Sequence, residues 1–253
     1  MWLHRRLCVA VSLLAFAAVD DVPAQSSAAR ISPLEMLVCH FVEGKGPNDL
    51  DGLARGFNEW MERTSAPAYA AYTLFPLAHS DEIDFDLAWI GAWPDGTTMG
   101  ASMAHYFTHG EELGPVFGSV MDCNNNRNFS VLTIRAPAEA GRFGPLEVAN
   151  CKLRIGSVVA DALNAVRQWV EYSRDLGSDA AHWALFPAYG EHSDAQYNFK
   201  WAVGYGSYES FGRDYDQFTN GDGLEKYGEL FAPLMSCDSP RLYSVRPIRL
   251  PRE

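Results

Sequence analysis

Two histidines four residues apart are the clearest candidates for chemistry in this sequence. His105 and His109 lie in a stretch whose apolar residues recur at helical spacing, so both imidazoles can share one face of a helix. Glu111 and Glu112 follow, and two imidazoles with a carboxylate could hold a metal ion. The stretch lacks the glutamate of the HExxH zinc motif. We therefore keep His105 and His109 as candidate catalytic residues, beside the alternative that they are exposed without a chemical role, and we expect no metal site.

Aromatic residues on two predicted strands form a second candidate site. Trp89 and Trp93 lie on one face of the first strand, and Trp201 and Tyr205 lie on one face of the other. Rings in this arrangement usually belong to the core. They can also line a pocket for a flat, apolar ligand, and we take these four as candidate ligand-binding residues. His182, at the start of another predicted strand, is expected to approach the same pocket.

Charged residues on the opposite face of the same strands need their own explanation. Asp86 and Lys200 alternate with the aromatic residues, so they point to the other side of each strand. If that side is also covered, a buried charge there requires a partner. The sequence predicts either an ion pair between Asp86 and Lys200 that joins two halves of the protein, or a catalytic acid and base.

Most of the chain repeats itself at a spacing of about 112 residues. The matching pairs are Cys39 and Cys151, Leu74 and Leu185, Trp89 and Trp201, Gly100 and Gly212, and Cys123 and Cys237. A unit of this length is a small domain, far longer than a solenoid repeat. We expect a first repeat at residues 34–135, a linker at 136–146 and a second repeat at 147–250.

Four of the five cysteines occupy matching places in the two repeats. Cys39 and Cys123 are 84 residues apart, and Cys151 and Cys237 are 86 residues apart. This placement favours one disulfide within each repeat, although four cysteines allow three pairings. Metal ligation is the alternative, but no CxxC spacing is present. Disulfides would imply an oxidising compartment.

The N-terminal residues have the composition of a secretory signal peptide. Residues 1–24 contain a basic start, an apolar stretch shorter than a membrane span, and a small-residue cleavage site. We expect a periplasmic or secreted protein without a membrane segment after cleavage; a retained anchor is the alternative. The net charge of −12 disfavours binding to nucleic acid or to an anionic membrane surface.

Each repeat has the same predicted order of elements: strand, helix, strand, strand, helix, strand. The opening strands are expected at Leu37 to Val42 and at Val148 to Ile155. In each repeat a short helical stretch leads into a longer helix, the second cysteine ends that helix, and the last strand follows. This is the ferredoxin-like βαββαβ plan. We predict an α+β protein in which two such units pack sheet to sheet and cover each other's open face.

Tandem units of this kind, with an aromatic third strand, resemble the dimeric α/β barrel superfamily. The resemblance covers residues 34–250 and is one of topology, without a motif of any subfamily. The superfamily includes antibiotic-biosynthesis monooxygenase-like proteins that use no cofactor, stress-responsive barrels, and haem enzymes such as chlorite dismutase. The resemblance implies a pocket and a monomeric pseudo-dimer. In haem members a helix histidine binds iron, so it also points to His105 or His109 as the residue to test.

Three functions remain open at this stage. The first is an exported barrel protein that binds a small hydrophobic or aromatic molecule without a cofactor, with or without monooxygenase-like turnover. The second is a haem- or metal-binding barrel protein that uses His105 or His109. The third is a non-catalytic envelope protein with an interaction partner. The first repeat is the better candidate for an active pocket, because its histidines at 40, 79, 105 and 109 have no counterpart in the second.

Overall fold

The computed structural model describes residues 31–80, 84–138 and 144–251, and the predicted signal peptide lies outside these ranges. The first half contains β1 (Ile31–Phe41), η1 (Pro47–Asp49), α1 (Leu50–Arg63), β2 (Ala70–Ala78), β3 (Leu87–Ala92), α2 (Gly96–His109), η2 (Gly110–Glu112), α3 (Leu113–Gly118) and β4 (Met121–Arg135). The second half contains β5 (Pro145–Leu153), α4 (Val159–Asp175), β6 (Ala181–Tyr189), β7 (Phe199–Gly204), α5 (Tyr208–Asn220), α6 (Gly223–Phe231), β8 (Met235–Cys237) and β9 (Arg241–Arg249). None of the helices in these ranges has the length and apolar character needed to cross a membrane.

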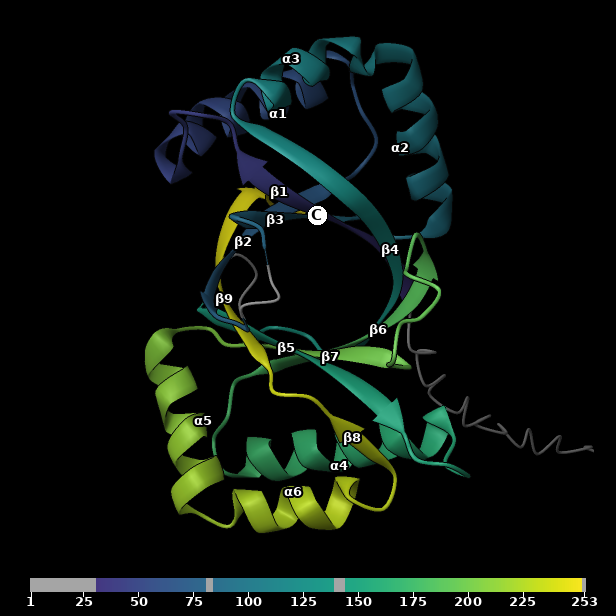
Figure 1. Cartoon of the computed structure of the whole chain (residues 1–253), viewed down its shortest axis with the longest axis vertical. Helices are drawn as coiled ribbons and strands as arrows, with labels where there is room; N and C mark the ends of the chain where they lie inside the picture. The colour runs from purple at the N-terminus through teal and green to yellow at the C-terminus, as the bar shows by residue number, and fades with distance from the viewer. Residues whose placement is uncertain (1–30, 81–83, 139–143, 252–253) are drawn as a thin grey trace, which may run out of the picture.

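Eight strands close into one antiparallel barrel. Their order is β7-β6-β4-β1-β3-β2-β9-β5, and a pairing between β5 and β7 closes the ring. The short strand β8 pairs with β5 beside the barrel. Figure 1 looks along the barrel and shows the first-half helices above it and the second-half helices below it.

The last strand of each half pairs with the second strand of the other half. β4 lies between β1 of its own half and β6 of the second half. β9 lies between β5 of its own half and β2 of the first half. The predicted intramolecular dimeric α/β barrel is therefore confirmed, and backbone hydrogen bonds as well as side chains join its halves.

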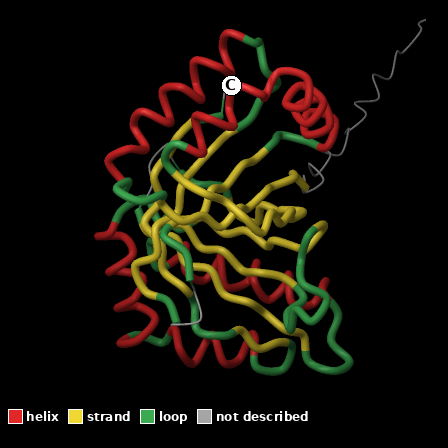
Figure 2. Tube along the Cα trace, turned by 45° about the horizontal axis from the view of Figure 1, so that its top comes forward, coloured by secondary structure: helices red, strands yellow, loops and turns green. Residues whose placement is uncertain are grey.

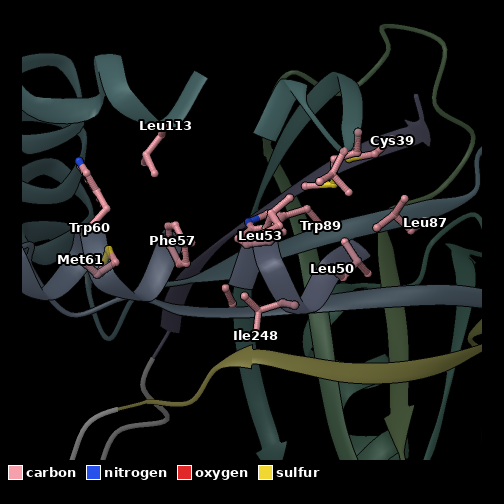
Figure 3. Close-up of a cluster of buried hydrophobic side chains, with 13 residues drawn as sticks. Cys39, Leu50, Leu53, Phe57, Trp60, Met61, Leu87, Trp89, Leu113 and Ile248 are labelled. Carbon is pink, nitrogen blue, oxygen red and sulfur yellow. The ribbon is translucent and has the colours of Figure 1, made fainter. Parts of the chain in front are cut away.

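The helices cover the outer face of the barrel because each has one apolar stripe. The buried residues of α1 recur at helical spacing and are Leu50, Leu53, Phe57, Trp60 and Met61. They pack against Leu87 and Trp89 of β3, and Figure 3 shows these side chains gathered between helix and strands. In the second half, residues of α4 pack in the same way against Phe199 and Trp201. Figure 2 shows the resulting arrangement, with helices outside and strands inside.

The inner face of the barrel holds a separate apolar cluster. Leu74, Ala88 and Tyr243 are buried there, and neighbours such as Ile90 and Val148 pack against them. Since neighbouring residues of a strand point to opposite faces, Ala88 faces the interior while Trp89 faces the helices. Both faces of the strands are therefore covered, as the sequence predicted.

Two details of the predicted elements are wrong. Of the two helices that follow the third strand of each half, the longer one comes first. α2 has 14 residues against 6 in α3, and α5 has 13 against 9 in α6. The Asp95 side chain accepts a hydrogen bond from Thr98 N at 2.8 Å, which caps α2 directly after the turn and lets the longer helix begin there. The second cysteines also lie in strands, Cys123 in β4 and Cys237 in β8, and do not end a helix.

The two predicted disulfides are present. Cys39 of β1 is bonded to Cys123 of β4, and Cys151 of β5 is bonded to Cys237 of β8. In both pairs the cysteines lie directly opposite each other on neighbouring strands, with Cα atoms 4.0 Å apart. Each bond therefore ties the first strand of a half to the segment that follows its last helix.

Removing either disulfide is expected to destabilise the protein. The bonds close loops of 84 and 86 residues, and bonds of this kind typically stabilise a fold by about 2–4 kcal/mol. The double variants Cys39→Ala/Cys123→Ala and Cys151→Ala/Cys237→Ala should each lose about that much free energy of unfolding in urea titrations. The reduced wild-type protein is the control and should be less stable than either double variant in its oxidised form. Unchanged midpoints in both variants would contradict the prediction.

Candidate functional site

Each half holds a cavity between the outer face of the barrel and its own helices. The first-half cavity has a volume of about 510 Å³ and lies between β1, β3 and β4 on one side and α1, α2 and α3 on the other. The second-half cavity has a volume of about 310 Å³ and lies between β5 and β7 and the helices α4, α5 and α6. Small-molecule sites commonly have volumes of about 300–1,000 Å³.

The five predicted ligand-binding residues all line these cavities. Trp89 and Trp93 line the first-half cavity, and His182, Trp201 and Tyr205 line the second-half cavity. All five are buried. The rings are thus core residues and cavity walls at once, and a ligand on them remains a prediction.

A chain of hydrogen bonds runs along the wall of the first-half cavity. Trp89 Nε1 donates to Tyr69 Oη at 2.8 Å, and the Tyr69 hydroxyl donates to Glu35 Oε1 at 2.6 Å. Burial raises the pKa of Glu35, while hydrogen bonds from Tyr69 and Asn126 oppose that shift. Burial and the charge of Glu35 raise the pKa of Tyr69, so the phenol stays protonated and keeps its role as donor. A cavity-wall carboxylate with a raised pKa is suited to accept a proton from a ligand.

Gly91 makes the position of Tyr69 possible. Gly91 lies opposite Glu35 in the pairing of β3 with β1. A methyl group on Gly91 would lie 1.9 Å from Tyr69 Oη, so the phenol occupies the space that a side chain would fill. The absence of a side chain at this position lets Tyr69 lie across β3 and reach both Trp89 and Glu35.

Two polar atoms near this chain are buried without a partner. The indole nitrogen Nε1 of Trp93 and the hydroxyl of Ser102 have no hydrogen-bond partner in the part of the chain that the structure describes. Both residues line the first-half cavity. Buried polar groups are nearly always satisfied in native proteins, so both atoms are available to bind a hydrogen-bonding group in this cavity.

The second-half cavity keeps part of this arrangement and changes the rest. Glu147 stands 112 residues after Glu35 and accepts a hydrogen bond from the Tyr205 hydroxyl at 3.2 Å. Trp201 stands 112 residues after Trp89, but its Nε1 donates to His182 Nδ1 at 3.3 Å. Burial, with a smaller effect of Arg135, lowers the pKa of His182 to about 3, so this imidazole is neutral.

The two candidate catalytic histidines lie close together on α2. Their ring centres are 4.6 Å apart, and His105 lines the first-half cavity while the exposed His109 does not. His105 Nε2 lies 2.9 Å from Thr64 Oγ1. Within the described ranges no three His, Cys, Asp or Glu residues are grouped to hold a metal ion. Nε2 of His105 is engaged by Thr64 and His109 is outside the cavity wall, so neither imidazole presents a free Nε2 to the cavity.

The predicted ion pair between Asp86 and Lys200 is wrong. Asp86 is exposed and accepts a hydrogen bond from Phe41 N at 2.8 Å. Lys200 Nζ donates to Asn150 Oδ1 at 2.7 Å and lies 4.1 Å from the ring centre of Tyr197, and burial lowers the pKa of Lys200 to about 8. The prediction extended strand alternation to Asp86, which precedes β3 and is not oriented by its pleat.

Glu35 and Tyr69 were missed as candidate residues. The available signal was that Glu35 and Glu147 are separated by the spacing of the repeat, each on the first strand of its half. A glutamate retained at matching strand positions is unexpected for a merely solvated side chain. The partners of Glu35 come from distant segments, so the hydrogen-bond chain itself is a property of the fold.

Comparisons with known proteins identify the fold. No family model matches the sequence, and no curated protein matches it. A candidate monooxygenase from Fusobacterium nucleatum subsp. nucleatum has a TM-score of 0.53 at 8% identity, with 88% of this chain and 95% of that chain covered. A candidate monooxygenase from Lactobacillus acidophilus has a TM-score of 0.51 at 12% identity, with 87% and 95% covered. A mutant of the chlorite dismutase from Candidatus Nitrospira defluvii has a TM-score of 0.52 at 8% identity, with 86% and 92% covered.

At these identities the similarity concerns the fold alone. The closed eight-stranded barrel and its two helical layers agree with the topology of these structures. The chain therefore has the dimeric α/β barrel fold shared by monooxygenase-like and chlorite dismutase-like proteins.

Proposed function

We propose that this protein is an exported barrel protein whose first-half cavity binds a flat, hydrophobic or aromatic compound and oxidises it without a cofactor. The observation that carries the proposal is the chain from Trp89 through Tyr69 to Glu35 at the wall of an apolar cavity. A base that is partly removed from water can take a proton from a bound ligand, and unsatisfied hydrogen-bond donors beside it can stabilise the anion that forms.

The walls of the cavity suit a ring system. Phe57 and Phe117 meet Trp89 edge to face, with ring centres 5.5 and 5.0 Å from it. Met103 and Phe107 of α2 also line the cavity and are exposed. An apolar ligand would cover these side chains, which water now contacts. The unsatisfied Trp93 Nε1 and Ser102 hydroxyl would bind an oxygen atom of the ligand.

The chemistry that fits these groups is oxidation of an activated methylene by molecular oxygen. Glu35 takes one proton from a carbon next to a carbonyl or an aromatic ring, and the donors of Trp93 and Ser102 stabilise the oxyanion of the resulting enolate. The electron-rich carbon then reduces O₂. The balance is R₂CH₂ + O₂ → R₂C=O + H₂O, in which the methylene loses four electrons and O₂ gains them. No further reductant is required.

Export is supported by the cysteines. All four cysteines of the described chain are bonded in pairs, and such bonds persist in oxidising compartments outside the cytoplasm. Residues 1–24, with their signal-like composition, supply the route. The N-terminal sequence of the protein recovered from a periplasmic or culture fraction tests this part of the proposal, since an intact Met1 would contradict cleavage.

Replacing Glu35 should remove turnover and leave binding largely intact. Anthrone is a suitable probe because it is flat, apolar and carries an activated methylene. In Glu35→Gln the rate of anthraquinone formation and O₂ uptake should fall by about a hundredfold or more, since a general base contributes that much. The wild-type rate should decline as pH falls through the pKa of Glu35, which lies above 4.5, because the protonated carboxyl cannot act as a base.

The exposed Glu43 provides the matched control for charge, and Glu43→Gln should keep the wild-type rate. Failure of the wild-type protein to bind anthrone in a fluorescence titration would overturn the proposed cavity ligand. Binding without O₂ uptake would overturn the oxidation and leave a binding protein.

A methyl group on Gly91 should raise the pKa of Glu35 while leaving the carboxyl group in place. In Gly91→Ala the phenol of Tyr69 must move, and Glu35 loses a hydrogen bond that lowers its pKa. The acid limb of the pH–rate profile should therefore shift to higher pH, and Tyr69→Phe should give a shift of the same sign. Gly52 of α1 has open space around it, so Gly52→Ala is the control and should leave the profile unchanged. A lower rate at every pH without a shift would contradict the positioning role of Gly91.

The purified protein is expected to be colourless and free of stoichiometric metal. The measurement is an ultraviolet–visible spectrum with metal analysis of the protein as isolated. A Soret band or bound metal that disappears in His105→Ala/His109→Ala, but persists in the exposed control His192→Ala, would establish the haem or metal function instead. The reason for the expectation is that His105 is already paired with Thr64.

A further inference from the structure

The second-half cavity combines an aromatic wall with three carboxylates, of which that of Asp238 is already paired with Arg241. Trp169 and Tyr227 meet edge to face with ring centres 5.8 Å apart, and Trp201 lies parallel to Tyr227. Glu147 and Asp214 line the same space. The described residues that line it include no lysine or arginine. Aromatic faces and carboxylates both attract cations, so the wall is selective for positive charge.

The charge of Asp214 disfavours the ionised form of Glu147. Burial raises the pKa of Glu147, and the charge of Asp214 raises it further. Burial also raises the pKa of Asp214, with a further contribution from Asp179, while Arg213 and Arg135 act in the opposite direction. Neither arginine lines the cavity. A cation between Glu147 and Asp214 would stabilise both charged forms at once.

His182 gives an independent indication of a ligand. It is 2% exposed and lines this cavity. Because an indole N–H can only donate, Nδ1 of His182 accepts from Trp201 and the neutral ring carries its proton on Nε2. Nε2 is buried and has no partner within the described ranges. His182 thus offers an unsatisfied donor and adds no positive charge, which suits a ligand oxygen.

The extra carboxylate distinguishes this cavity from that of the first half. Asp214 of α5 stands 112 residues after Ser102 of α2, and both line their cavities. The first half therefore places Glu35 with a neutral hydroxyl, and the second half places Glu147 with a second acid. The two cavities therefore differ in charge at this pair of matching positions.

We propose that the second-half cavity is a binding site for a small organic cation, an alkylated ammonium ion that carries a hydroxyl or carbonyl oxygen. The ammonium group lies between Glu147 and Asp214 against the aromatic wall, and the oxygen accepts a hydrogen bond from His182 Nε2. This site is separate from the first-half cavity and does not depend on the oxidation proposed there.

Choline and its neutral isostere test the charge requirement. Choline has a trimethylammonium group and a hydroxyl, and 3,3-dimethyl-1-butanol has the same shape with carbon in place of nitrogen. Calorimetric titration of the full mature chain should show choline binding about tenfold or more tightly than the alcohol, because only choline interacts with the carboxylates and the ring faces as a cation. Equal affinities, or no binding of choline, would overturn the proposal.

Two variants of α5 locate the site. Asp214→Asn keeps an acceptor for the Ser178 hydroxyl and should weaken choline binding by about tenfold or more while the melting temperature is retained. Asp216→Asn removes the same charge from an exposed position of the same helix and should leave the affinity unchanged. Equal weakening in both variants would show that choline responds to the overall negative charge of the protein, and would overturn the assignment of the cavity. The result is independent of Glu35, so failure here leaves the proposed function of the first half intact.

Discussion

The exchange of last strands between the two halves is the constraint on which the rest of this structure depends. β4 supplies backbone partners to β6, and β9 supplies them to β2, so each half completes the hydrogen bonds of the other. Without this exchange the eight strands would not close into a ring, and the sheet of each half would have unpaired edges. Because closure fixes the register of every strand, it also fixes which side chains face the interior and which face the helices.

That register places both cavities outside the barrel. The interior is filled by an apolar cluster around Leu74, Ala88 and Tyr243, which leaves the outer face for ligands. On the outer face, each helical layer packs on large aromatic side chains such as Trp89 and Trp201, and these side chains also line the two cavities. Glu35 and Glu147 are held by the strands β1 and β5, which give a carboxylate a more rigid support than a loop would.

The sequence predicted the architecture well because the relevant signals are local or periodic. Alternation along residues 87–93, helical spacing in α1, and the matching cysteines each follow from short-range pattern, and the structure confirms the barrel and both disulfides. The candidate site was predicted less well. Glu35, Tyr69 and Gly91 come together through pairing of β1 with β3 and through a ring that lies across a glycine, and neither contact has a sequence period. The wrong prediction for Asp86 has a related cause. Asp86 lies one residue before β3, where the alternation of the strand does not determine the direction of a side chain.

The two cavities show how one backbone plan can carry two different sets of polar side chains in a single chain. Both have a glutamate on the first strand and a tryptophan on the third, which gives each cavity a partly buried acid and an indole donor. Three differences distinguish the second-half cavity from the first. Val203 stands where Gly91 makes room for Tyr69, so the second half has no such space for a phenol. His182 takes the indole hydrogen bond there, and its pKa of about 3 keeps it neutral beside the acids. Asp214 stands where the first half has Ser102, which places an acid beside Glu147 where the first half has a hydroxyl beside Glu35. In a homodimer every such difference would appear in both sites together, whereas two halves in one chain allow the base proposed for one cavity and the cation site proposed for the other. The strand exchange makes this divergence structurally inexpensive, because the differing residues lie on the outer face and leave the backbone pairing that holds the barrel unchanged.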